Sequence, residues 1–225
     1  MTNELLFFLH ISIISGATIA FGRMGKEALV AYVSLLFVIA NIFVIKQIEI
    51  FSWYATTADA FIIGISFSIN LLQEFWGKKI ARKAIVISFA CSAFYMIMTQ
   101  FLLHYIPIAQ DMSHPHFIAI MNNTLRIVTA SFISYLVTQF IDTALYGYLK
   151  NRTNGRYFVL RNYFSICTSQ LLDTILFSFL GLYGIVANLW HIIFISYIIK
   201  LIAMIAITPW LLVAKKYIAF SSKVD

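Results

Sequence analysis

The chain has 225 residues, of which 61% are hydrophobic and 11% are charged, and its formal net charge is +7. Soluble domains carry about 25% charged residues, so a soluble chain of this composition would have too little polar surface to face water. The composition therefore excludes an ordinary soluble domain and predicts that the lipid bilayer is the solvent. The two cysteines, Cys91 and Cys167, lie in apolar runs without metal-ligand spacing, and we expect both to be small core residues.

Seven apolar runs are long enough to cross the hydrocarbon core, which takes about 20 helical residues. They cover residues 5–22, 27–46, 53–76, 84–106, 117–148, 163–186 and 189–214. The first run lacks the basic flank and the cleavage site of a signal peptide, so we expect it to be retained. The fifth is longer than one crossing needs at about 1.5 Å per residue, so it should tilt, protrude or begin at the membrane surface. The predicted fold is an all-α polytopic membrane protein of about seven transmembrane helices, in a single domain over residues 1–225.

The basic residues alternate from one loop to the next. Thirteen of the sixteen lie after the first, third and fifth runs and in the C-terminal tail: Arg23, Lys26, Lys78, Lys79, Arg82, Lys83, Lys150, Arg152, Arg156, Arg161, Lys215, Lys216 and Lys223. The opposite loops contain Lys46 alone. The positive-inside rule then predicts an external N-terminus and a cytoplasmic C-terminus. We attribute the net charge to topology and contacts with lipid headgroups, and expect no nucleic-acid partner.

Six charged residues lie inside the apolar runs: Asp59, Glu74, Arg126, Asp142, Asp173 and Lys200. A charge at the bilayer centre costs about 2.5–3.5 kcal/mol, so each should face a partner or a wet cavity. Matched depths predict that Asp59 pairs with Arg126 and that Asp173 pairs with Lys200. Glu74 precedes the basic turn GKKIARK, which predicts a structural pairing with Lys78 or Arg82; proton coupling is an alternative for Glu74 and for Asp142.

Two of the runs contain nearly the same polar motif. Thr138-Gln139-x-x-Asp142-Thr143 occurs in the fifth run, and Ser169-Gln170-x-x-Asp173-Thr174 occurs in the sixth. Residues three apart share one helix face, so each motif presents an amide beside a carboxylate. This pair suits a planar ligand with adjacent N–H groups, such as a nucleobase edge. Phe177 and Tyr197, on the faces of Asp173 and Lys200, are the candidates for stacking on such a ring.

Four segments together resemble the queuosine precursor transporter family, also called vitamin uptake transporters. They are NLLQEFWGKKIARKA, RIVTASFISYLVTQFIDT, RNYFSICTSQLLDTILF and YIIKLIAMIAITP, and the resemblance runs from about residue 56 to residue 209. It implies import of 7-deazaguanine bases or queuine across the bacterial inner membrane, for salvage into tRNA queuosine. Members with six helices lack the extra N-terminal helix expected here.

The predicted substrate-binding residues are Asp173, Gln170, Lys200, Gln139, Asp142, Arg126, Asp59, Thr174, Phe177 and Tyr197. We expect a multi-pass transporter with no enzymatic activity, cofactor or metal, whose partners are a small-molecule substrate and membrane lipids. No ATP-binding motif occurs, so ATP-driven transport would need separate ATPase subunits.

Three alternatives remain open at this stage. They are a membrane subunit that binds another vitamin-like molecule, a seven-helix retinal protein with Lys200 as the Schiff-base lysine, and an intramembrane enzyme. The retinal reading is disfavoured because Ser196, not Asp, precedes the lysine by four residues. The enzyme reading is disfavoured because no G-x-S-x-G or H-E-x-x-H motif occurs, and we expect the His114–His116 pair in an outer loop to be solvated rather than metal-bound.

Overall fold

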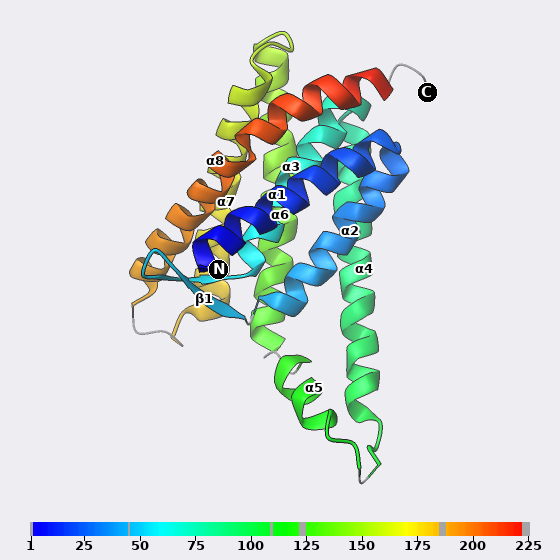
Figure 1. Ribbon diagram of the computed structural model, residues 1–225, viewed down its shortest axis with the longest axis vertical. Helices are drawn as coiled ribbons and strands as arrows, with labels where there is room; N and C mark the ends of the chain where they lie inside the picture. The colour runs from blue at the N-terminus through cyan, green and yellow to red at the C-terminus, as the bar shows by residue number, and fades with distance from the viewer. Residues whose placement is uncertain (1, 45, 109, 122–124, 185–187, 222–225) are drawn as a thin grey trace.

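The computed structural model describes residues 2–44, 46–108, 110–121, 125–184 and 188–221, and these form a long helical bundle (Figure 1). The helices are α1 (Asn3–Arg23), α2 (Lys26–Phe43), α3 (Ala58–Trp76), α4 (Lys78–His104), α5 (His114–Met121), α6 (Leu125–Arg152), α7 (Phe158–Phe177), the π-helical turn η1 (Ser178–Leu182) and α8 (Leu189–Ser221). Two short strands, β1 (Gln47–Ile50) and β2 (Trp53–Thr56), lie between α2 and α3.

Helix α3 is the central helix of the bundle. Its residues from Ala58 to Gln73 are buried except for the partly exposed Ile62, and it contacts α1, α2, α4, α6, α7 and α8. The contact with α1 is especially close, because a Cβ atom at Gly64 would overlap the side chain of Ile14. A helix surrounded on all sides has no face for lipid, so the serines, the asparagine and the glutamine of α3 can bond only to other helices or to cavities.

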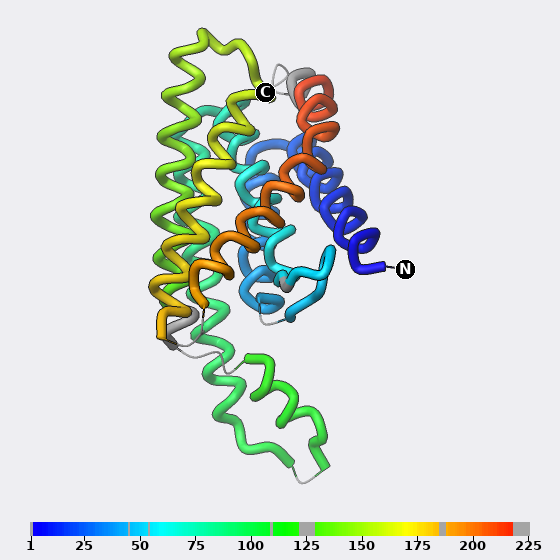
Figure 2. Tube along the Cα trace, turned by 90° about the vertical axis from the view of Figure 1, so that its left-hand side faces the viewer, coloured from blue at the N-terminus to red at the C-terminus, as the bar shows by residue number. Residues whose placement is uncertain are grey.

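Among the described helices, six are long and apolar enough to cross a membrane: α1, α2, α3, α4, α7 with η1, and α8. Helix α6 has 28 residues but is not one of these six. The structure therefore supports a polytopic helical membrane protein, while the count of seven spans stays a prediction. The expected run 117–148 is divided between α5 and α6. Helix α5 lies beside the lower part of α4, and the two protrude together from the body of the bundle (Figures 1 and 2).

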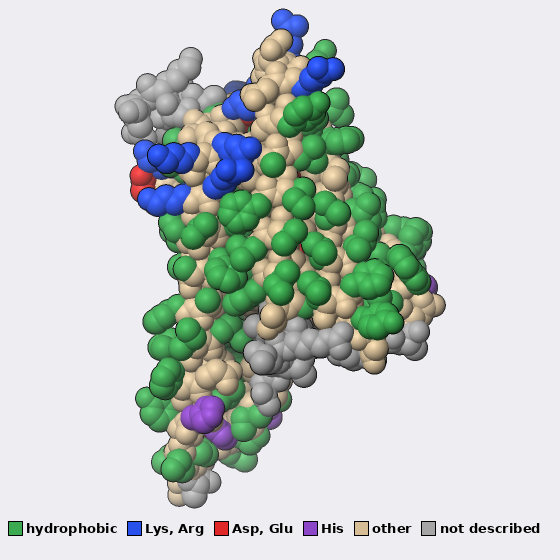
Figure 3. All heavy atoms as spheres, turned by 180° about the vertical axis from the view of Figure 1, so that it is seen from behind, with side chains coloured by type: hydrophobic (Ala, Val, Ile, Leu, Met, Phe, Trp, Pro, Cys, Tyr) green, Lys and Arg blue, Asp and Glu red, His purple; other side chains and the backbone are tan. Residues whose placement is uncertain are grey.

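The long helices alternate in direction, so that the loops rich in Lys and Arg meet at one end of the molecule. Figure 3 shows these side chains gathered at that end and the histidines near the other. We call the first the basic end. The opposite end, where α2 stops and α3 starts, carries the two strands, and we call it the hairpin end. This arrangement is the one that the charge alternation predicts, although which end faces the cytoplasm stays a prediction.

The expectation of an all-α fold is wrong in one detail, since β1 and β2 pair as an antiparallel hairpin. Its two-residue turn, Phe51–Ser52, has positive φ at both positions (52° and 62°), the geometry that matches the twist of paired strands. Helix α1 holds the turn in place, because Glu4 accepts a hydrogen bond from the Phe51 N–H (3.1 Å) and Asn3 donates to the Glu49 carbonyl (2.9 Å). The N-terminal helix thus positions the hairpin.

Candidate functional site

A cavity of about 550 Å³ lies at the hairpin end, between α2, α3, α6, α7, η1 and α8. Strand residues Gln47, Ala55 and Thr56 line it as well, so the hairpin forms part of its wall. Ligand sites in proteins have volumes of about 300–1,000 Å³, with mostly apolar walls and a few convergent polar groups. The cavity has this character, and its charged groups come from three helices.

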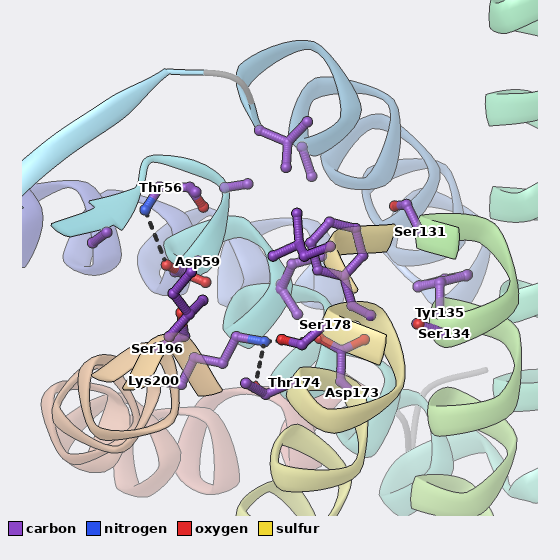
Figure 4. Close-up of a pocket in the computed structure, with 18 of the residues that line it drawn as sticks. Thr56, Asp59, Ser131, Ser134, Tyr135, Asp173, Thr174, Ser178, Ser196 and Lys200 are labelled. Atoms are coloured by element: carbon purple, nitrogen blue, oxygen red, sulfur yellow. Dashed lines mark hydrogen bonds and ion pairs between the residues drawn. The ribbon is translucent and has the colours of Figure 1, made fainter. Parts of the chain in front are cut away.

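Lys200, Asp173 and Asp59 are the charged residues of the cavity wall (Figure 4). The Lys200 ammonium donates to Asp173 Oδ2 at 2.7 Å and to Thr174 Oγ1 at 3.2 Å. Asp59 accepts from the Thr56 N–H at 3.2 Å and also interacts electrostatically with Lys200. The predicted pairing of Asp173 with Lys200 is confirmed. With every group ionised, two carboxylates face one ammonium, so the site favours a ligand that brings N–H donors or positive charge.

Aromatic rings form another part of the wall. Tyr135 stacks on Phe37 with ring centroids 3.7 Å apart and an interplanar angle of 18°. The Tyr135 hydroxyl bonds to Ser88, which fixes the ring, and Phe177 also lines the cavity. The wall therefore offers flat apolar surface near the charged groups, which suits a planar aromatic ligand.

The two glutamines of the repeated motif lie deeper, outside the cavity wall. Gln139 of α6 and Gln170 of α7 each donate from Nε2 to the same acceptor, Ser66 Oγ of α3, at 3.1 Å. Both side chains are buried, with 1% exposure each. The motif thus joins α6 and α7 to the central helix, and neither glutamine reaches a ligand in the cavity of this state.

Asp142 lies further toward the basic end and is fully buried. The Ser165 hydroxyl donates to Asp142 Oδ1, and also contacts the Asp142 carbonyl oxygen at 3.1 Å. The second carboxyl oxygen, Oδ2, has no hydrogen-bond partner within the described part of the chain. The nearby Ser169 hydroxyl instead donates to the Ile166 carbonyl at 3.1 Å. Asp142 therefore occupies the same motif position as Asp173 but does not line the cavity.

The expected partner of Glu74 is wrong. Instead of Lys78 or Arg82, Glu74 binds Arg161 through two hydrogen bonds (3.1 and 3.2 Å). It also accepts from the Tyr146 hydroxyl at 2.8 Å, and Lys150 lies 3.2 Å from the carboxylate. Arg161 further donates to the carbonyl groups of the loop before α7. These bonds tie α3, α6 and α7 together at the basic end, where bidentate geometry makes the contact strong.

Two other predicted site residues lie away from the cavity or outside the described part. Tyr197 does not line the cavity, and its hydroxyl donates to the Cys167 carbonyl at 3.3 Å. The side chain of Arg126 lies outside the described residues, so its pairing with Asp59 stays a prediction. Five of the predicted site residues line the cavity: Asp173, Lys200, Asp59, Thr174 and Phe177.

Sequence reasoning missed several polar and aromatic residues of the wall, namely Asn41, Thr56, Ser131, Ser134, Tyr135, Ser178 and His191. Ser131, Ser134 and Tyr135 precede Gln139 by about one and two helical turns. Their spacing along one helix face was the available signal.

Comparison with known proteins agrees with this architecture. Residues 56–214 match the family described as "Putative vitamin uptake transporter". The chain belongs to this family. It is also 32% identical over 203 residues to a Bacillus subtilis (strain 168) protein named "Probable queuosine precursor transporter", covering 88% of this chain and 86% of that protein. No solved structure matches significantly. The resemblance recognised in the sequence is therefore confirmed.

Family membership has two direct consequences. This vitamin uptake transporter is a multi-pass protein of the bacterial inner membrane, as predicted. Membership also decides against the retinal-protein alternative, even though Lys200 does lie against a carboxylate as a Schiff-base lysine would.

Proposed function

We propose that this protein imports queuosine precursors, 7-deazaguanine bases or queuine, across the inner membrane for salvage into tRNA queuosine. The name of the B. subtilis relative supports this class of substrate. The observation that carries the proposal is the Asp173–Lys200 pair in the wall of a cavity with aromatic surface.

The hydrogen-bonding edge of the base matches this pair. A 7-deazaguanine presents an exocyclic amine and a ring N–H side by side, followed by a carbonyl oxygen. The Asp173 carboxylate can accept from both N–H groups in a bidentate contact, and the Lys200 ammonium can donate to the carbonyl. The base would then replace part of the Lys200–Asp173 bond, and its ring would lie against Phe177 or Tyr135. A base that lacks the adjacent donors would leave the carboxylate underbonded in a dry site, which is how the site would select its ligand.

The position of the cavity supports import as the direction of transport. The wall is built from the hairpin and from the helix ends beside it. We infer that the hairpin end faces outward and the basic end faces the cytoplasm, in keeping with the positive-inside rule. The described state is then the one that receives substrate from outside.

Complementation tests this proposal. A strain that cannot make queuosine and lacks its own importer should regain queuosine in tRNA when it expresses the protein and receives a precursor. The cyano, aminomethyl and queuine forms are each supplied, and membrane abundance is measured in parallel. Failure of a well-expressed protein with all three forms would refute the proposed substrate.

A proton uncoupler adds information on the energy source. Uptake that the uncoupler abolishes points to a carrier driven by the proton gradient. Uptake that survives it, but requires other subunits, points to an associated ATPase, since the sequence contains no ATP-binding motif.

A further inference from the structure

The two Gln-x-x-Asp motifs approach Ser66 from two neighbouring helices. Gln139 and Gln170 meet there, one from each of two neighbouring helices. Helices α6 and α7 run antiparallel, so a step of three residues beyond each glutamine leads toward opposite ends of the bundle (Figures 1 and 2). With a rise of about 1.5 Å per residue, the two aspartates are separated by about 9 Å along the bundle axis. Asp173 thereby reaches the cavity, and Asp142 lies on the side of the basic end.

The two glutamines and Asp142 form a buried cluster that lacks some of its possible hydrogen bonds. Three buried oxygen atoms have no hydrogen-bond partner in the described part of the chain: Gln139 Oε1, Gln170 Oε1 and Asp142 Oδ2. All three are acceptors. None of the ion pairs among the described residues includes Asp142, and the Ser165 hydroxyl donates to its Oδ1 atom. Since each unsatisfied buried group costs free energy, such a cluster requires an explanation.

A second, smaller cavity lies directly beyond this cluster, at the basic end. It has a volume of about 410 Å³ and is lined by residues of α3, α4 and α6, among them Gln73, Lys78 and Gly147. Gln73 connects the wall of this cavity to the cluster, because its amide donates to the carbonyl of Thr143, the residue next to Asp142, at 2.9 Å. The Oε1 atom of Gln73 is another buried acceptor without a partner in the described residues. Buried polar groups of α3, α6 and α7 therefore lie between the first cavity and the second.

We propose that Asp142, Gln139 and Gln170 form a second binding site for the same donor-bearing base, closed in this state and opened toward the basic end in the other state. The inference rests on the proposed function. The first site offers a carboxylate to two ligand N–H groups, and the second offers the same chemistry at the inverted position. Repeats of opposite orientation that place a site near the membrane centre are a common basis of alternating access. During transport the base passes from Asp173 to Asp142, where its N–H groups displace the Ser165 hydroxyl and satisfy the free acceptors.

The test separates binding at the first site from passage through the second. Purified protein is assayed for binding of labelled 7-cyano-7-deazaguanine. The same protein in liposomes is assayed for net uptake and for exchange of labelled against unlabelled base. We expect Asp142→Asn to bind within about threefold of wild type but to lose both uptake and exchange by at least about tenfold, because the inner acceptor becomes a donor. Asp173→Asn should lose binding itself. Glu27→Gln, at an exposed residue of the basic end, is the control.

Several results would overturn the proposal. If Asp142→Asn exchanges the base normally but no longer accumulates it, Asp142 carries the coupling proton instead of binding the base. If Asp142→Asn both exchanges and accumulates the base normally, Asp142 has only a structural role. If wild type neither binds nor exchanges the base, the proposed function fails, and this inference fails with it.

A second variant covers the case in which Asp142→Asn does not fold. Thr143→Cys, in a chain with Cys91→Ala and Cys167→Ala, places a thiol at a position that is fully buried in this state. If the base drives the inner half open, 7-cyano-7-deazaguanine should raise the rate of maleimide labelling at least about threefold, as a shift in population requires. An unchanged rate overturns the proposal.

Discussion

Asp173→Asn and Lys200→Met remove the two partners of one ion pair, and we expect them to affect the protein differently. The pair is short (2.7 Å), and the two side chains are only 15% and 7% exposed. Lys200 also has Thr174 as an acceptor and Asp59 as a second electrostatic partner. The ammonium therefore has two hydrogen-bond partners and the charge of a second carboxylate near it, whereas the two carboxylates share one cation.

The magnitudes follow from what each substitution leaves behind. Asp173→Asn leaves Lys200 with its other partners, and the Asn oxygen can still accept, so we expect a loss of stability of about 1–3 kcal/mol. Lys200→Met leaves two buried carboxylates without their cation, which should cost about 3–5 kcal/mol. Ligand binding should nevertheless fall at least about tenfold in Asp173→Asn, since 1.4 kcal/mol is a factor of about ten in affinity.

The assay compares membrane abundance with uptake per molecule. A fluorescent tag after Asp225 reports abundance, and uptake of labelled precursor is measured at low concentration. Asp173→Asn should lose less abundance than Lys200→Met and should be low in uptake per molecule, whereas Lys200→Met should be low in both. The double variant Asp173→Asn with Lys200→Met should recover only part of the abundance, because Asp59 still lacks its cation, and it should not recover uptake. Glu27→Gln, whose side chain is 80% exposed, controls for the loss of a surface ion pair, which is worth about 0–1 kcal/mol.

One result would refute the reasoning. If the double variant recovers uptake as well as abundance, the pair only holds α7 against α8, and Asp173 does not contact the ligand. Equal losses of abundance in the two single variants would refute the asymmetry, because Asp59 would then contribute nothing to the site.

Three further predictions concern the orientation in the membrane, the ion pair at the end of α3 and the aromatic wall of the cavity. A reporter fused after Asp225 should be cytoplasmic, and a cysteine at Ser113 should react with an impermeant maleimide from outside; labelling only after lysis would reverse the orientation. Arg161→Gln, which breaks the buried bidentate pair at the end of α3, should lower stability by about 3–5 kcal/mol in a thermal-shift assay, whereas Arg82→Gln should change it little. Tyr135→Leu should weaken precursor binding in the equilibrium assay by about two- to tenfold, because aromatic contacts are worth about 0.5–1.5 kcal/mol beyond buried area; unchanged affinity would remove Tyr135 from the ligand wall.

Hydropathy and charge in the sequence determined the class of protein and the arrangement of its basic loops. Apolar runs of this length have no alternative to a membrane helix, because unpaired backbone groups cannot be left in lipid. The loop charges then predict the direction of each helix. Membrane depth, calculated from residue number, was also enough to pair Asp173 with Lys200, since both lie near the middle of their helices.

Depth does not give the rotation of a helix about its axis, and this is where prediction from sequence failed. Glu74 was paired with residues just after it in the chain, but the close packing of α3 against α6 and α7 brings Arg161 and Lys150 nearer. Tyr197 was placed with Lys200, three residues away, but its hydroxyl reaches the backbone of α7 instead.

The repeated motif shows the division most clearly. The sequence by itself determined that each copy carries an amide and a carboxylate on one helix face, because the spacing of three residues allows nothing else. Only the tertiary structure decided that the two amides share Ser66 and that the two carboxylates lie on opposite sides of it. The physical reason is that the antiparallel packing of α6 and α7 inverts one copy relative to the other, and this relation depends on contacts between helices that no local pattern records.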